Sequence, residues 1–117
     1  MGTGAKFSPG SGIGNYSLNA ATTGTGRAIS FHDCRQVTWQ TIYVAGAEPT
    51  TGTVIIEQAP SADYAGTWNE LAEIILTAVV TGDDGFNTYP GQTGFVRARF
   101  SVDSDQAVSV ILNGLLT

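Results

Sequence analysis

One stretch of the chain places a base, a carboxylate and a thiol together. His32, Asp33 and Cys34 are consecutive, and these residue types serve as general base, orienting group and nucleophile in covalent catalysis. Consecutive residues of a strand point to opposite faces, so Asp33 cannot share a face with its two neighbours. The groups of a catalytic triad normally come from separate segments. We therefore expect no catalytic residue here, but a buried Cys34 beside a His32 at the rim of the fold.

Metal and nucleotide sites are not expected either. His32 and Cys34 supply too few nitrogen and sulfur ligands for zinc. The acidic pairs at 83–84 and 103–105 lack the spacing of a calcium loop, and we interpret both as turns. The glycine-rich segment 10–14 has the composition of a phosphate-binding loop, but no strand precedes it and no helix follows it. We expect no cofactor, no metal and no enzymatic activity.

Two arginines could take part in recognition. Arg97 and Arg99 lie two residues apart in an alternating segment, so their guanidinium groups stand side by side on one face of a strand. In one interpretation they lie on a solvated outer face and pair with local carboxylates such as Glu57. In the other they contact an acidic neighbouring molecule. The sequence leaves both interpretations open.

Aromatic side chains are the second candidate for recognition. We expect Trp39 to lie in the core and Trp68 to pack across two sheets. Tyr64, Phe86 and Tyr89 remain candidates for an exposed surface. Such a surface would stack on a sugar or form part of a protein interface, where aromatic residues are enriched.

The charge of the chain excludes several partners. Charged residues make up 13% of the chain and the net charge is −5. The basic residues do not form a run: they are Lys6, Arg27, Arg35, Arg97 and Arg99. Because a duplex binder needs clustered basic residues to neutralise phosphates, we do not expect nucleic-acid binding. A low charge content is common in proteins that are packed into an assembly.

Length and patterning predict one all-β domain. The chain has 117 residues, and we divide it into a flexible Gly/Ser-rich arm at 1–14 and a domain at 15–117. No apolar stretch approaches the roughly 20 residues of a membrane helix, and the N-terminus lacks the apolar centre of a signal peptide. We therefore expect the protein to be made in the cytoplasm and not to associate with a membrane. The single cysteine allows no internal disulfide.

Period-2 alternation of apolar residues predicts seven to nine short strands. The clearest segments are 27–31, 37–44, 53–58, 95–102 and 107–112, with shorter ones at 16–18 and 86–89. We expect inward side chains at Val96, Ala98, Phe100, Val102, Val108, Val110 and Leu112. The turn at 103–106 is expected to join the last two strands as a hairpin. Residues 68–76 fit either a short helix or a strand that starts near Ile74, and we favour the strand. The pattern predicts an antiparallel two-sheet sandwich or jelly roll.

Three segments carry a resemblance to a known group of proteins. They are GTVIIEQ at 52–58, SADYAGTWNEL at 61–71, and GFVRARFS at 94–101, which runs into AVSVILNG at 107–114. Together they cover about residues 50–114. In this order they resemble small β-sandwich structural proteins of tailed-phage virions, such as capsid decoration (cement) proteins and related head and tail accessory proteins.

The resemblance implies a virion protein that is made in the host cytoplasm and binds major capsid subunits. It implies many copies per particle, with a trimer as the favoured homo-oligomer. A neck or tail adaptor or a fibre-associated module is the first alternative, and a carbohydrate-binding β-sandwich module is the second. From the residues themselves, the expected partner contacts are Lys6, Phe7, Tyr89, Arg97 and Arg99.

Overall fold

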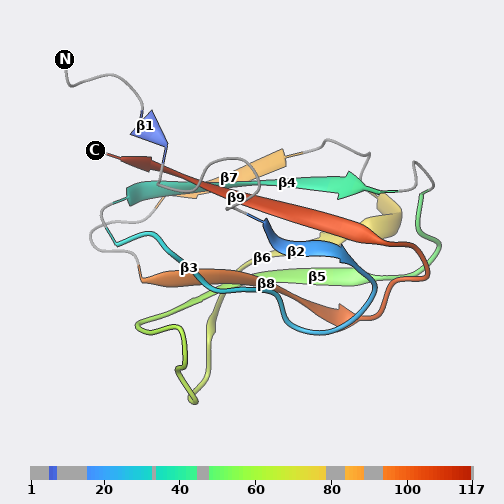
Figure 1. Cartoon of the computed structure of the whole chain (residues 1–117), viewed down its shortest axis with the longest axis horizontal. Helices are drawn as coiled ribbons and strands as arrows, with labels where there is room; N and C mark the ends of the chain where they lie inside the picture. The colour runs from blue at the N-terminus through green and yellow to red at the C-terminus, as the bar shows by residue number, and fades with distance from the viewer. Residues whose placement is uncertain are drawn as a thin grey trace.

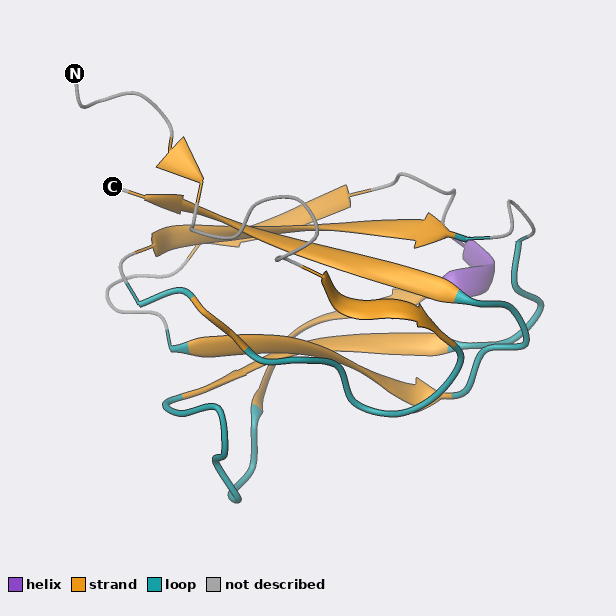
Figure 2. Cartoon of the chain, viewed as in Figure 1, coloured by secondary structure: helices purple, strands orange, loops and turns teal. Residues whose placement is uncertain are grey.

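The strands form two antiparallel sheets (Figure 1). The computed structural model describes residues 6–7, 16–32, 34–44, 48–78, 84–88 and 94–116. Within these ranges the strands are β1 (Lys6–Phe7), β2 (Tyr16–Ala21), β3 (Ile29–Ser30), β4 (Cys34–Tyr43), β5 (Thr53–Ala59), β6 (Asn69–Ile75), β7 (Asp84–Thr88), β8 (Phe95–Val102) and β9 (Val108–Leu116). A short 3₁₀ turn, Leu76–Ala78, follows β6 and is the coil drawn in Figure 2. None of the helical segments in these ranges has the length and apolar character of a membrane span.

The strand order is that of a jelly roll. In the first sheet β9 lies between β4 and the two strands β1 and β2, and β7 lies at the far side of β4. The second sheet has the order β3-β8-β5-β6. The pairs are nested, because β2 pairs with β9, β3 with β8, β4 with β7 and β5 with β6. This nesting is what results when one long antiparallel hairpin rolls up into two packed sheets. The predicted all-β sandwich is confirmed.

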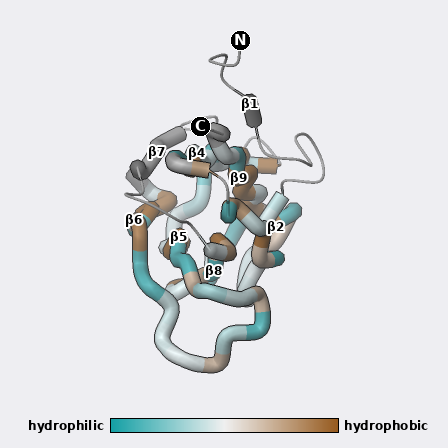
Figure 3. Tube along the Cα trace, turned by 90° about the vertical axis from the view of Figure 1, so that its left-hand side faces the viewer, coloured by the Kyte–Doolittle hydropathy of each residue, from teal (hydrophilic) through white to brown (hydrophobic). Residues whose placement is uncertain are grey.

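The core lies between the two sheets, which Figure 3 shows as separate layers with β4 and β9 in one and β5 and β8 in the other. Buried apolar side chains of both layers form one cluster. Its fully enclosed members include Val37, Val54, Ile56, Val96, Ala98, Val108, Val110 and Leu112. Trp39 and Cys34 also belong to it, as expected. Each sheet thus keeps the apolar face of the other away from water.

The predicted hairpin between the last two strands is wrong. β8 pairs with β3 and β5 in the second sheet, whereas β9 pairs with β1, β2 and β4 in the first. Residues 103–107 therefore cross from one layer to the other. Alternation showed that each strand has an apolar face, and both faces do point inward, but alternation does not specify which strand is the partner.

Residues 69–75 form a strand, so the helical alternative for 68–76 is wrong. β6 pairs with β5 over its whole length, begins earlier than expected and ends at Ile75. Ile56 pairs with Ala72 and Glu57 with Glu70, so Leu71 is an extra residue in the ladder. This bulge allows both Leu71 and Ala72 to pack against the core, which produces an apolar spacing like that of a helix.

A second bulge corrects the prediction for Val102. Val54 pairs with Phe100 and Thr53 with Val102, so Ser101 is the extra residue. Because one inserted residue reverses the phase of a strand, Val102 turns from the inner face to the outer face and is 51% exposed. The other inward residues predicted for β8 and β9 are buried.

The predicted N-terminal arm lies mostly outside the described residues. Lys6–Phe7 form β1, which pairs with Leu115 and Leu116 at the end of β9. The strand predicted at 86–89 is observed as Asp84–Thr88, which pairs with β4.

Candidate functional site

A buried carboxylate joins two arginines on the outer face of the second sheet. Oε2 of Glu57 accepts a hydrogen bond from Nε of Arg97 at 2.7 Å, and Oε1 accepts one from Nε of Arg99 at 2.9 Å. The side chain of Glu57 is 3% exposed, against 22% for Arg97 and 37% for Arg99. Arg97 and Arg99 share a face as predicted, and they pair with Glu57 as in the first of the two interpretations that the sequence left open. We call these three residues the Glu57 cluster.

The strand periodicity explains the position of the cluster. Val96 and Ala98 of β8 point into the core, so Arg97 and Arg99 point outward. On β5, Glu57 is paired with Arg97 across the ladder. Charge-assisted hydrogen bonds of this kind are shorter and stronger than neutral ones, which offsets the cost of burying the carboxylate. Two guanidinium groups and one carboxylate leave one excess positive charge.

Trp68 lies against the cluster and not between the sheets, so its predicted position was wrong. The Cζ atom of Arg97 is 3.7 Å from the centroid of a Trp68 ring, within the range of a cation–π contact. The indole Nε1 of Trp68 donates a hydrogen bond of 3.0 Å to the backbone oxygen of Tyr64. Residues 60–68, which connect β5 to β6, thus bring the indole back onto the outer face.

The terminal nitrogens of both guanidinium groups remain available for a partner. Each arginine uses Nε to bind Glu57. Within the described part of the chain, no protein acceptor binds the Nη atoms of Arg97 or Arg99. Glu57 therefore holds the two side chains in place while leaving their planar donors for a carboxylate or another acceptor.

The rest of this face combines apolar and acidic groups. Ile75 of β6 is 48% exposed and Val102 of β8 is 51% exposed. Both pair with Thr53 of β5, so they flank it on the same face of the sheet. Glu70 and Glu73 line the β6 side and are exposed. The face thus has two arginines near its centre, apolar groups at one end and carboxylates along one edge.

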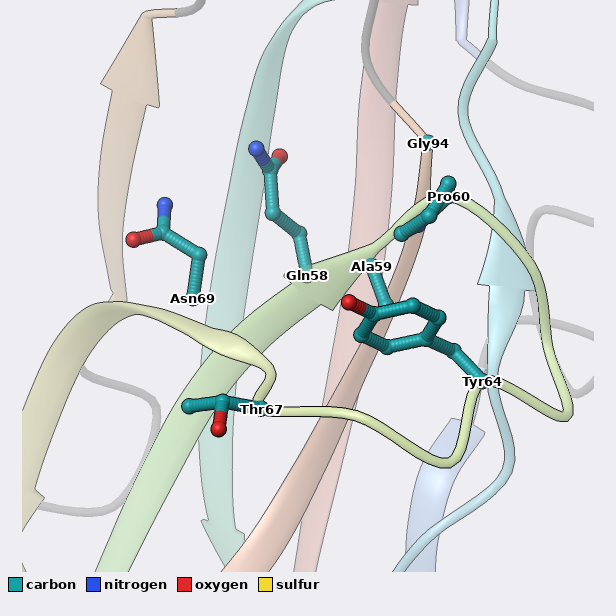
Figure 4. Close-up of a pocket in the computed structure, with 7 residues that line it drawn as sticks. All are labelled: Gln58, Ala59, Pro60, Tyr64, Thr67, Asn69 and Gly94. Atoms are coloured by element: carbon teal, nitrogen blue, oxygen red, sulfur yellow. The ribbon is translucent and has the colours of Figure 1, made fainter.

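A small pocket lies beside the cluster, where β5 ends and β6 begins (Figure 4). It has a volume of about 280 Å³ and is lined by Gln58, Ala59, Pro60, Tyr64, Thr67, Asn69 and Gly94. Gln58 and Asn69 are directly opposite each other in the β5–β6 ladder. The Oε1 atom of Gln58 is buried and has no hydrogen-bond partner among the residues the structure describes. Tyr64 is 40% exposed.

Two of the remaining predicted contact residues are not part of this region. Lys6 and Phe7 lie in β1 of the first sheet, and Tyr89 lies outside the described residues. Gln58 and Asn69 were not singled out from the sequence. No sequence signal distinguishes an amide at a strand end that borders a pocket from one that faces water.

His32 and Cys34 occupy the positions expected of them. Cys34 is buried, and His32 is half-buried. Nδ1 of His32 lies 2.8 Å from Oγ of Ser30, and its ring meets Phe95 edge to face with centroids 5.1 Å apart. Asp33 is outside the described residues. Among those described, no group of three or more His, Cys, Asp or Glu side chains is arranged to hold a metal ion.

Two aspartates anchor the loops at the other end of the sandwich. Asp105 accepts hydrogen bonds from Oγ1 and N of Thr50, at 2.6 and 2.8 Å, and from N of Thr51 at 3.2 Å. The hydroxyl of Thr50, followed by its backbone N–H, lowers the pKa of the Asp105 carboxyl. Oδ1 of Asp103 accepts a hydrogen bond from Thr23 at 2.8 Å. Both carboxylates thus tie together loops that are distant in sequence.

The fold defines the chain as a two-sheet jelly-roll protein. Jelly rolls occur in viral capsid proteins, lectins and cupins, so the fold by itself assigns no function. No protein-family model, curated protein or solved structure matches the chain.

Proposed function

We propose that this chain is a non-enzymatic structural protein of a tailed-phage particle, and specifically a capsid decoration (cement) protein. The observation that carries the proposal is the Glu57 cluster on an open sheet face beside the exposed Ile75 and Val102. Arginines and aromatic residues are enriched at protein interfaces. The resemblance supports the same class, and the residues 50–114 that carry it include β5, β6, β7, β8 and most of β9.

The cluster suggests how capsid subunits are bound. Glu57 holds the guanidinium groups of Arg97 and Arg99 before any partner arrives, so less side-chain freedom is lost on binding. An acidic segment of the major capsid protein fits the terminal nitrogens of these arginines. The exposed Ile75 and Val102 add apolar area beside this charged contact.

Stabilisation of the head then follows from mass action. A protein that binds the expanded shell and not its precursor shifts the equilibrium toward the expanded form. Several weak contacts per oligomer strengthen one another, because the second contact is intramolecular once the first has formed. A homotrimer would present three such faces. Lys6, Phe7 and Tyr89 stay predictions for further contacts.

The test adds purified protein to expanded capsids that lack it. We expect co-sedimentation and a rise in the capsid Tm. Arg99→Ala should weaken binding roughly tenfold, and the wild-type affinity should fall as salt is raised. Arg27→Ala is the matched control, because Arg27 is an exposed arginine in the loop between β2 and β3. If the wild-type protein neither co-sediments nor raises the capsid Tm, the proposal is overturned.

Copy number per particle distinguishes a neck or tail position from a position on the capsid surface. Quantitative mass spectrometry of purified particles measures the chain relative to the major capsid protein. A copy number comparable to that of the major capsid protein supports decoration. A copy number that is a small fraction of it supports an adaptor or a fibre-associated module.

A further inference from the structure

We propose that two copies of this chain pair face to face through the outer side of the second sheet, about a two-fold axis that runs along β5. The partner is thus a second copy, and it covers the face that the proposed function assigns to the capsid. The two contacts exclude each other, so the dimer is the form of the protein before it meets a capsid. Self-association is measured without capsids and can therefore fail while capsid binding holds.

The ladder registers arrange the outer face as three rows that cross β8, β5 and β6. Side chains directly opposite each other in a ladder lie on the same face of the sheet. Written in the order β8, β5, β6, the rows are Arg97, Glu57, Glu70, then Arg99, Ile55, Glu73, then Val102, Thr53, Ile75. The β8 side thus carries two bases and one apolar residue, and the β6 side carries two acids and one apolar residue.

A two-fold axis along β5 makes the charged rows complementary. The axis exchanges the β8 side of one copy with the β6 side of the other and keeps each row at its own level. Arg97 then faces Glu70 of the second copy, and Arg99 faces Glu73 of the second copy. Each contact occurs twice, as in any isologous interface. At the axis itself, the carboxylate of Glu57 is already bound by both arginines of its own copy.

The third row adds an apolar contact at the same register. Val102 is 51% exposed and Ile75 is 48% exposed, and the axis brings each against the other in the second copy. Their burial removes apolar surface from water. A two-fold axis across the strands would instead place β8 on β8, where arginine meets arginine at an unfavourable cost. The pattern therefore selects the axis along β5, which also keeps the strands of the two sheets aligned, as face-to-face packing prefers.

The connection between β5 and β6 limits the approach at one end of this face. Figure 1 shows residues 60–68 projecting beyond the second sheet at the end where β8 begins. Trp68 lies on Arg97 at this end. The axis brings the two connections to the same end of the dimer. The rows of Arg99 and Val102 are therefore the ones that come closest.

The size of the face predicts a weak dimer. Four strands about 4.8 Å apart, with the eight residues of β8 rising about 3.3 Å each, give about 500 Å² of sheet per copy. A stable protein interface buries about 800 Å² per partner. We therefore expect a Kd on the order of 10–100 µM. Such a dimer dissociates readily when a multivalent capsid surface competes for the same face.

Sedimentation equilibrium of the full chain, over concentrations that span this Kd, tests the proposal. We expect a reversible monomer–dimer equilibrium that weakens as salt is raised, because ion pairs form part of the contact. Glu73→Lys should weaken the dimer at least roughly tenfold, since it places a second base opposite Arg99. Glu48→Lys is the matched control: it makes the same change in net charge at an exposed site between β4 and β5, and it should dimerise normally.

A mixing experiment tests the two-fold pairing itself. Ile75→Lys and Val102→Glu should each weaken the dimer when measured alone, because each places a charge against an apolar side chain. Both positions are exposed, so the fold tolerates the changes, and equal unfolding midpoints check this. An equimolar mixture of the two variants should associate more tightly than either alone. In the mixed dimer, the introduced lysine faces the introduced glutamate once, and the native Val102–Ile75 contact remains once.

Three results would overturn the proposal. They are a chain that stays monomeric at every concentration, self-association that Glu73→Lys leaves unchanged, and a mixture that associates no better than its components. Co-sedimentation of the wild-type chain with capsids is scored separately. Capsid binding by a chain that never dimerises would refute the dimer alone, and a dimer that ignores capsids would refute the proposed function alone.

Discussion

Nε of Arg97 on β8 donates a hydrogen bond of 2.7 Å to Oε2 of Glu57 on the neighbouring strand β5. The other carboxylate oxygen binds Arg99, so one buried acid holds two partly exposed bases. Without it, two long side chains on an outer face would sample many rotamers. The same contact therefore stabilises the sheet and orients the guanidinium donors on which the proposed binding of a partner depends.

Glu57→Gln should lower the free energy of unfolding by about 1–3 kcal/mol. The amide keeps the shape of the side chain but loses the charge that compensates Arg97 and Arg99 in a partly buried site. Denaturant unfolding measures the change. Glu73→Gln is the control, because Glu73 is exposed on the neighbouring strand β6. Equal midpoints for the two variants would contradict a stabilising role for the cluster.

Gly52→Ala should destabilise the protein by about 2–4 kcal/mol. Gly52 has a φ of +132°, and an added Cβ would lie 2.7 Å from Cδ1 of Leu76 and 3.1 Å from Cβ of Ser104. Gly24→Ala separates backbone strain from crowding, because Gly24 has a φ of +96° with nothing within 4 Å of its added Cβ. We expect about 1–2 kcal/mol for that control in thermal or denaturant unfolding. A Gly24 variant that is as damaging as the Gly52 variant would rule out the steric contribution.

Tyr43→Phe should lower the free energy of unfolding by about 1–2 kcal/mol. The hydroxyl of Tyr43 on β4 donates a buried hydrogen bond of 2.6 Å to the backbone oxygen of Leu76, and so joins the first sheet to the 3₁₀ turn after β6. The phenyl ring would preserve packing but leave that oxygen unsatisfied. Tyr64→Phe, which changes an exposed tyrosine, should have little effect in the same denaturation series. If both variants melt alike, the buried hydrogen bond contributes nothing measurable.

Stability should fall in acid in part through Asp105. Hydrogen bonds from Thr50 and Thr51 lower the pKa of its carboxyl below the ordinary value of 3.8. A depressed folded-state pKa stabilises the protein above the unfolded-state pKa, and this contribution is lost as the pH falls through the folded-state pKa. Asp105→Asn should therefore flatten the decline in the unfolding midpoint below about pH 4.

The control for Asp105 is Asp63→Asn, in the exposed connection between β5 and β6. That variant should keep the wild-type pH profile. An Asp105 variant whose profile follows the wild type at every pH would show that the hydrogen bonds to Thr50 and Thr51 are not linked to folding.

Much of the fold was predictable because it depends on local alternation. The inward positions Val96, Ala98, Val108 and Val110 follow from period-2 patterning, and the same rule places Arg97 outside. A sandwich then follows because two apolar faces must cover each other. The ion pair with Glu57 was predicted only as one of two interpretations, since facing strands cannot be identified from one strand alone.

The sequence by itself determined that the chain is all-β, which side chains form most of the core, and that Arg97 and Arg99 share a face. Only the tertiary structure decided that β8 and β9 lie in different sheets, that Val102 faces outward and that Gln58 borders a pocket. The physical reason is the distance along the sequence between the residues that decide each feature. Side-chain direction is set by neighbouring residues, whereas strand pairing and bulges are set by contacts between segments far apart in the chain.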